Sequence, residues 1–101
     1  MSNRVQITGN LATDIVERKS AKGTMYTFNV VDNGFYKPQY FPIVCYDKEV
    51  IDKLGDTRKG QSLVILGVLR NNTYTDKNNV THYIVNIVAD TVEHSVDTRK
   101  E

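Results

Sequence analysis

The sequence has little cysteine and no long hydrophobic run. A single cysteine, Cys45, among 101 residues excludes an internal disulfide. Stability must therefore come from a hydrophobic core or from association between subunits. No segment reaches the length of a membrane span, and residues 1–9 lack the apolar stretch of a secretory signal. These absences predict a cytoplasmic protein of one domain, since 101 residues are too few for two.

An excess of charge of one sign is also missing. Thirteen Lys and Arg residues oppose twelve Asp and Glu residues, which gives a net charge of +1 and by itself argues against a polyanionic partner. The charges are nevertheless unevenly placed along the chain. Residues 1–46 and 57–89 together carry +5, whereas residues 47–56 and 90–101 together carry −4. The whole-chain average therefore hides a positive region that could follow a phosphate backbone.

Signatures of catalysis are absent from the sequence. Two histidines, His82 and His94, and one inward-facing cysteine do not form the close pairs that a zinc site requires. The six glycines are isolated from one another, so no glycine-rich phosphate loop is present. The sequence predicts a protein that is not an enzyme and that holds no metal or cofactor, with Cys45 as a small buried hydrophobe.

Apolar and polar residues alternate with period two along most of the chain, which indicates β-strands. Gly9 lies inside the first such run, where a glycine indicates a bulge or sharp bend. Asp47 is a good helix N-cap and Gly55 a good C-terminal stop, so one short helix is expected between them. The expected elements are strands over 4–12, 24–32, 39–46, 62–74 and 81–91, a polar turn over 17–23, a helix over 47–55 and a polar tail from residue 92.

This order of elements predicts an all-β fold. One short helix cannot cover the sheet of an alternating β/α protein. Five strands with a helix between the third and fourth match the five-stranded Greek-key barrel of the oligonucleotide/oligosaccharide-binding (OB) fold. A small SH3-like barrel is the nearest alternative, but it would lack the helix. The expected organisation is a barrel domain over residues 1–93 and a flexible tail over 94–101.

Aromatic side chains are concentrated in one short segment. Five of the nine lie between residues 35 and 46. Four tyrosines are expected to face away from the core: Tyr36, Tyr40, Tyr46 and Tyr74. Aromatic rings stack on nucleic-acid bases of any sequence, at about 1–3 kcal/mol per base. The same rings could close a subunit interface or cover a barrel end, but their position beside cations favours base stacking.

Several segments, in order along the chain, resemble the bacterial single-stranded DNA-binding proteins. The resemblance extends over most of residues 3–93, and no single motif in it is diagnostic. The matching segments are residues 3–11 (NRVQITGNL), 45–48 (CYDK), 59–64 (KGQSLV), 67–70 (GVLR), 74–76 (YTD) and 87–90 (IVAD).

The resemblance implies sites for bases and for phosphates. The base-stacking positions of the family match Tyr40, Tyr46 and Tyr74, and a fourth falls at Phe35 or Tyr36. The phosphate-binding cations match Arg4, Lys48 and Arg70, with looser matches at Arg58 and Lys59. Lys37 and Lys77 lie in the two loops, 33–38 and 70–82, that are expected to clamp the DNA.

Two departures from the family pattern qualify the resemblance. Tryptophan is absent, so stacking would rest on the smaller tyrosine ring. The family's long linker and acidic tail are also missing, because the sequence ends at residues 97–101 (DTRKE). A short form of this kind is similar to phage, plasmid or mobile-element versions of the family.

The function expected from sequence is sequence-independent binding of single-stranded DNA in replication, recombination or repair. The resemblance also implies a homo-oligomer, a dimer or a tetramer, with replication or recombination proteins as further partners. One alternative is an adaptor of a primosome or replisome whose aromatic face docks a helicase, primase or polymerase. Another is an RNA-binding cold-shock-type barrel, which would need outward aromatics where Tyr26 and Phe28 are expected to face the core.

Overall fold

The computed structural model describes residues 2–34 and 36–95, which form one six-stranded sheet and one short helix. Most of the strands bury every second side chain, as expected when one face of a strand packs on a core. In chain order the elements are β1 (Val5–Leu11), β2 (Val16–Ser20), β3 (Gly23–Asp32), β4 (Gln39–Cys45), α1 (Lys48–Leu54), β5 (Ser62–Thr75) and β6 (Thr81–His94).

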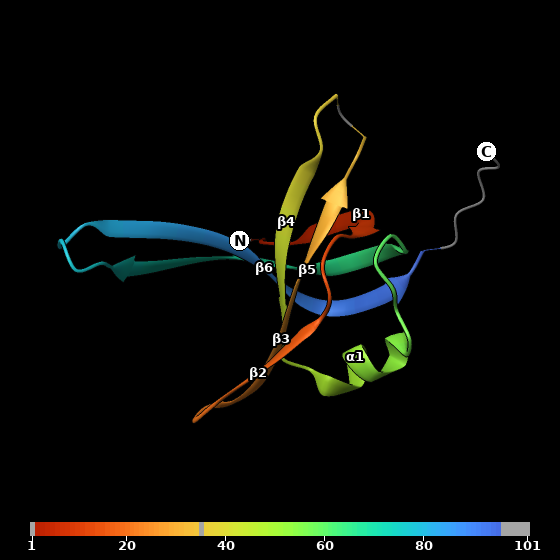
Figure 1. Cartoon of the computed structure of the whole chain (residues 1–101), viewed down its shortest axis with the longest axis horizontal. Coiled ribbons are helices and arrows are strands. Elements are labelled where there is room, and N and C mark those ends of the chain that lie inside the picture. The colour runs from red at the N-terminus through yellow and green to blue at the C-terminus, as the bar shows by residue number, and fades with distance from the viewer. Residues whose placement is uncertain (1, 35, 96–101) are drawn as a thin grey trace.

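Five of the strands close into a barrel, which Figure 1 shows. They are hydrogen-bonded in the order β1-β5-β6-β4-β3, and β3 returns to β1 where Asn10 pairs with Val31. The contact between β4 and β6 is parallel, with Ile43 beside Ile87, and the other contacts are antiparallel. The prediction of an all-β, five-stranded OB barrel with a helix between its third and fourth barrel strands is confirmed.

The inward faces of the barrel strands form the hydrophobic core. Val30, Leu63 and Ile65 have no solvent exposure. Gly9 lies where β1 passes close to β3: a Cβ atom at position 9 would lie 2.7 Å from the carbonyl oxygen of Val31. Only glycine permits this approach, so the bend expected at Gly9 has a physical cause.

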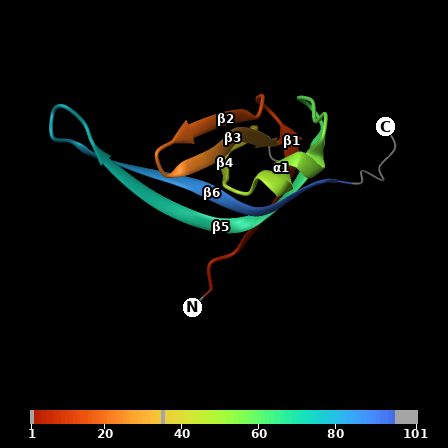
Figure 2. The same cartoon turned by 90° about the horizontal axis from the view of Figure 1, so that it is seen from below.

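Helix α1 covers one end of the barrel. Its N-cap is Asp47, whose Oδ1 accepts a hydrogen bond from the Glu49 amide at 2.9 Å. It ends at Gly55, which has the positive φ of 60° that glycine tolerates. Leu54 is buried, and Val50 and Ile51 pack against the core. The helix predicted from these caps is confirmed, and Figure 2 shows it at the barrel end.

Strand β2 was not expected, and the polar turn predicted over 17–23 is wrong. Residues 16–20 pair along β3 from Val16 opposite Thr27 to Ser20 opposite Gly23, which leaves Ala21 and Lys22 as the turn. All five residues of β2 are exposed, and β3 is its single partner strand among the described residues. A strand without a buried face has no apolar alternation, so its sequence is indistinguishable from a loop.

The C-terminal strand extends past its predicted end. It was expected to stop at residue 91, but β6 continues to His94, and the amide of Ser95 donates to the Ser62 carbonyl at 2.9 Å. A bulge between Leu66 and Gly67 shifts the pairing, so that both Ala89 and Val92 face the core. This shift breaks the alternation that was used to place the strand end. The predicted tail, residues 94–101, falls mostly outside the described residues.

A two-stranded arm projects from the barrel. Beyond the pair Arg70–Asn86, β5 and β6 continue to pair with each other up to Thr75 and Thr81. The pairing of β6 with β4 involves only Ile87 and Val88. Residues 71–85 are therefore called the arm. Figures 1 and 2 show it extending away from the barrel, at the opposite end of the molecule from α1.

Candidate nucleic-acid interface

The register of the sheet places the outward side chains of β4, β6 and β5 on one continuous surface. Residues that pair across strands share a face, and alternate residues along a strand repeat it. Val88 of β6 pairs with Val44 of β4 on one side and with Val68 of β5 on the other. This surface, called the outer face, includes Tyr40, Pro42, Val44, Asn86, Val88, Val68, Arg70 and Tyr74.

The tyrosines that were expected to point away from the core do so. Tyr40 is 63% exposed, Tyr46 is 58% exposed and Tyr74 is 51% exposed. Tyr40 lies on the outer side of β4, and Tyr74 lies on the arm. Tyr46 follows the end of β4 and lines a pocket with Val88 of the outer face. Tyr26 and Phe28, by contrast, are buried in the core as predicted. The outer face therefore presents three rings that could each take a base on an open side.

The loop between β3 and β4 carries a further ring. Tyr36 is 92% exposed, and the ammonium nitrogen of Lys37 lies 5.7 Å from its ring centroid, within the range of a cation–π contact. This pair brings one predicted stacking residue and one predicted phosphate-binding residue together. Phe35, the other aromatic predicted at this loop, lies outside the described residues.

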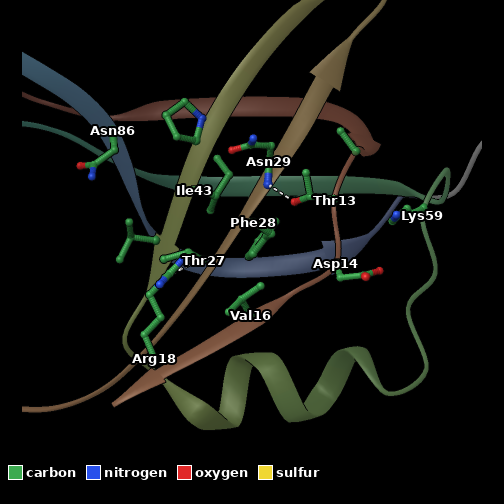
Figure 3. Close-up of a pocket in the computed structure, with 13 residues that line it drawn as sticks. Thr13, Asp14, Val16, Arg18, Thr27, Phe28, Asn29, Ile43, Lys59 and Asn86 are labelled. Atoms are coloured by element: carbon green, nitrogen blue, oxygen red, sulfur yellow. Dashed lines mark hydrogen bonds between the residues drawn. The ribbon is translucent and has the colours of Figure 1, made fainter. Parts of the chain in front are cut away.

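A groove of about 620 Å³ lies beside Pro42 and Val44. Its walls come from β2, β3, β4, β6 and the segments before β2 and β5, and Figure 3 shows Arg18 and Lys59 at its two ends. Arg18 Nε donates to Thr27 Oγ1 at 3.3 Å, and the Asn29 amide donates to Thr13 Oγ1 at 2.9 Å. The groove continues the outer face from β4 onto β3, since Thr27 pairs with Val44.

Arg18 was missed by the sequence reading. Among the described residues neither Arg18 nor Lys59 forms an ion pair, so both charges are available to a ligand. Arg18 was missed because its segment was expected to be a turn, which assigns no face to its side chains. If a two-residue turn at Ala21 and Lys22 had been predicted, Arg18 would have been paired with Met25 and its side chain placed on the side of the outer face.

The other predicted phosphate-binding cations are spread around the outer face. Arg70 lies on it and pairs with Asn86. Lys48 lines a smaller pocket with Tyr46 and Asp90, and its Nζ lies 3.8 Å from Asp52 Oδ2. Lys77 lies in the turn of the arm, and Arg4 precedes β1, which borders the far side of β5. The structure thus places Lys48 and Arg70 near the tyrosines, whereas β5 and β6 lie between Arg4 and the strand of Tyr40.

The end of the arm contains a cluster that sequence reading did not find. The Tyr74 and His82 rings are stacked, with centroids 4.7 Å apart and an interplanar angle of 15°. His82 Nε2 lies 2.8 Å from Asp76 Oδ2. This hydrogen bond and that from the Val80 amide hold the pKa of Asp76 below its ordinary value. The pairing of Tyr74 with His82 could have been found from sequence, because the two residues are equally distant from the middle of the turn and therefore face each other across the hairpin.

The opposite side of the arm carries exposed apolar side chains among asparagine and threonine residues. Tyr83, Val85 and Leu69 alternate with the outer-face residues and are exposed, with Tyr83 at 72%. No role was predicted for this surface from sequence. It provides an aromatic side chain on the same arm that does not lie on the outer face.

Cys45, the one cysteine of the sequence, lies in the core. Cys45 is fully buried, and this burial raises the pKa of its thiol. In the described part of the chain no group of three or more His, Cys, Asp or Glu residues could hold a metal ion. A helix long and apolar enough to cross a membrane is likewise not found among the described residues.

The fold and the aromatic outer face define the class: an OB barrel with a surface suited to an oligonucleotide. The chain belongs to the single-strand binding protein family, whose model matches residues 2–95. Comparison with curated protein sequences gives no match.

Solved structures of other proteins share the fold. A mitochondrial single-stranded DNA binding protein of S. cerevisiae, Rim1, is similar with a TM-score of 0.80 and 14% sequence identity, over 93% of this chain and 96% of that one. A Plasmodium falciparum SSB in complex with ssDNA is similar with a TM-score of 0.77 and 20% identity, over 92% of each chain.

Proposed function

We propose that this protein binds single-stranded DNA without regard to base sequence and holds the strand along the outer face. The observation that carries this proposal is the shared exposure of Tyr40, Tyr46 and Tyr74 on one surface with Arg70. Stacking contributes about 1–3 kcal/mol per base and tolerates every base, because each has a π-face. Three such contacts provide affinity without sequence readout, and Tyr36 and Phe35 would add to them from the β3–β4 loop.

The cations would hold the phosphates on either side of the stacked bases. Arg70 is on the outer face itself, Lys48 is beside Tyr46, and Lys37 and Lys77 are at the two projecting loops. The ion pair between Lys48 and Asp52 is exposed, so it costs little to exchange for a phosphate. Arg4 would take a phosphate only if the strand continued across β5 to β1.

The groove at Arg18 and Lys59 extends the proposed path. It begins at Pro42 and Val44, between Tyr40 of β4 and Tyr46 just after β4, and crosses β3 towards β2. Its two unpaired cations would hold phosphates while Thr27 and Asn29 line the floor. The strand would therefore run from the arm, across β6 and β4, into this groove.

The biological setting proposed for this activity is replication, recombination or repair of DNA in the cytoplasm, and no catalytic step is required. Self-association is supported by β1, whose residues Val5–Gly9 pair on one side with β5 and have no strand on the other side among the described residues. An unpaired strand edge can pair with the same edge of a second copy. A dimer or tetramer is the assembly we propose.

A second candidate is the adaptor function, favoured by the exposed apolar side chains on the opposite side of the arm. Tyr83, Val85 and Leu69 are exposed there, and aromatic and aliphatic side chains of this kind are enriched at protein interfaces. A replication or recombination protein could dock on this side while DNA occupies the outer face. Pull-down from nuclease-treated extract with the wild type and Tyr83→Ala separates this candidate from DNA binding.

The experiment that tests the main proposal is a fluorescence-anisotropy titration of labelled oligo-dT and of a duplex of equal length, at several salt concentrations. The expected result is tighter binding to oligo-dT, with log K falling by about 0.7 per phosphate contact for each tenfold rise in salt. Equal binding to the duplex, or no binding at low salt, would contradict the proposal.

A further inference from the structure

The arm ends in a three-residue unit that holds one ring of the outer face in place. Tyr74 and His82 pair directly across β5 and β6, and their rings are stacked at 4.7 Å with an angle of 15°. His82 is in turn 2.8 Å from Asp76 Oδ2. Tyr74 is the one predicted stacking residue whose ring contacts another ring in the described part of the chain.

Asp76 is itself fixed by the turn. Its Oδ1 accepts hydrogen bonds from the amides of Asn78 at 2.8 Å and Val80 at 3.0 Å. Its backbone amide donates to the Val80 carbonyl at 3.0 Å. The carboxylate therefore has little freedom, and the imidazole bound to it is held in a defined plane against Tyr74.

The stacked arrangement leaves one face of the Tyr74 ring for a base. Stacked carbon atoms prefer a separation of about 3.5–4.0 Å, so a base inserted between the two rings would need them about 7–8 Å apart. The observed centroid distance of 4.7 Å excludes such insertion. A base can reach the ring of Tyr74 only from the side opposite His82.

We infer that His82 is a positioning residue for DNA binding: it covers one face of Tyr74 and holds the ring so that the other face receives a base. This inference rests on the proposed function. Fixing a side chain before binding removes an ordering cost equivalent to about two- to twelvefold in affinity. Arg70 and Lys77 already supply cations on the two sides of Tyr74, so the role of His82 does not depend on a phosphate contact.

The test is a double-mutant cycle in oligo-dT affinity with the wild type, Tyr74→Ala, His82→Ala and the combined variant. We expect His82→Ala to weaken binding about fivefold when Tyr74 is present and less than about twofold when Tyr74 is absent. An equal loss in both backgrounds would show that His82 contacts DNA independently, and would overturn the inference. Thermal unfolding of each variant establishes that the barrel remains folded.

Two conservative variants separate the contacts of His82. His82→Phe keeps a planar ring against Tyr74 and loses the hydrogen bond to Asp76, whereas His82→Gln keeps a hydrogen-bonding group and loses the ring. Rescue of affinity by Phe and not by Gln supports positioning through stacking. Rescue by Gln alone would overturn the inference, since the loss of affinity in His82→Ala would then come from the hydrogen bond to the turn and not from the stack. The ring-current shift of the His82 proton signals, lost in Tyr74→Leu, reports the stack in solution.

Failure of the inference and failure of the proposed function give different results. If Tyr74→Ala weakens binding and His82→Ala does not, the inference is overturned and the proposed function stands. If Tyr40→Ala weakens binding and Tyr74→Ala does not, the inference is again overturned. If none of these variants changes affinity, the proposed function itself is contradicted.

Discussion

Strands β5 and β6 contribute to both the barrel and the arm, yet the two parts are stabilised differently. The first half of β5 buries Leu63 and Ile65 completely in the core. From Arg70 to Thr75 every residue of β5 is exposed, and the partner residues of β6 include the exposed Tyr83 and Val85. The barrel is thus a folded core, whereas the arm is a hairpin with two solvent-facing sides.

This difference separates the side chains that stabilise the fold from those that lie on its surface and do not. Isolated hairpins are at best marginally stable in water, so the arm depends on the barrel from which it extends. Apolar and aromatic residues on the arm do not contribute to a core and must serve a surface. We therefore expect truncations in the barrel core to alter the free energy of unfolding and truncations on the outer face, including that of the arm, to alter binding.

The largest expected effect is on stability, from a truncation in the barrel. Leu63→Ala removes a side chain with no solvent exposure and should lower the free energy of unfolding by about 2–5 kcal/mol. Val85→Ala, an aliphatic truncation on the arm, should change it by less than about 0.5 kcal/mol. Denaturant unfolding of both variants measures the difference. Similar losses at the two positions would remove the distinction between barrel and arm.

The next effect is on binding, from removal of the arm. Replacing residues 71–85 by Asn-Gly joins the paired residues Arg70 and Asn86 through a two-residue hairpin turn. The barrel should keep its thermal stability, while affinity for oligo-dT should fall about tenfold or more because the Tyr74 stack is lost. Circular dichroism melting and anisotropy report the two properties. Full affinity without the arm would show that the DNA binds to the barrel surface alone.

A smaller effect is expected at the groove. Replacing both Arg18 and Lys59 by alanine should reduce the slope of log K against log salt by about 1.4, since each single-strand phosphate contact contributes about 0.7. Lys19→Ala is a matched control, because Lys19 lies on the same strand and is paired with Glu17 at 3.4 Å. The loss should appear with long oligonucleotides and not with those too short to reach the groove. An unchanged slope would exclude the groove from the path.

The smallest effect is the pH response of the turn in the arm. The hydrogen bonds from His82 and Val80 lower the pKa of Asp76 in the folded protein, so Asp76 stabilises the turn above the ordinary aspartate pKa of about 3.9. That stabilisation is lost as the pH falls through the lowered value. The Asn78 and Val80 amide signals should titrate below pH 4 in the wild type and not in Asp76→Asn. Titration at or above the ordinary value would contradict the hydrogen-bond assignment.

The parts of the fold that could be predicted from sequence are those with a local or periodic cause. The helix follows from its caps, Asp47 and Gly55, and the barrel strands follow from buried alternation. Strand β2 could not be predicted because none of its residues is buried. The end of β6 was misplaced because the pairing shift at Leu66 and Gly67 leaves Asp90 of β6 without a partner, which changes the alternation of the residues that follow it.

The candidate site was predicted in part for the same reason. Tyr40 could be placed outward because it alternates with the buried strand face that contains Ile43. His82 could not be assigned to Tyr74, since their contact depends on the exact register across the turn. Arg18 required the pairing of β2 with β3. Contacts that depend on the register between two strands could be identified only from the structure, whereas side chains placed by alternation within one strand could be predicted from sequence.

The central claim is that the tyrosines of the outer face hold single-stranded DNA by stacking. The direct measurement is the oligo-dT affinity of Tyr40→Ala combined with Tyr74→Ala, compared with Tyr83→Ala. Tyr83 is more exposed than either residue but lies on the other side of the arm. Loss of two stacks should weaken binding by about 100-fold, while Tyr83→Ala should stay within about twofold of the wild type. Binding by the double variant within twofold of the wild type, or an equal loss in Tyr83→Ala, would contradict the claim.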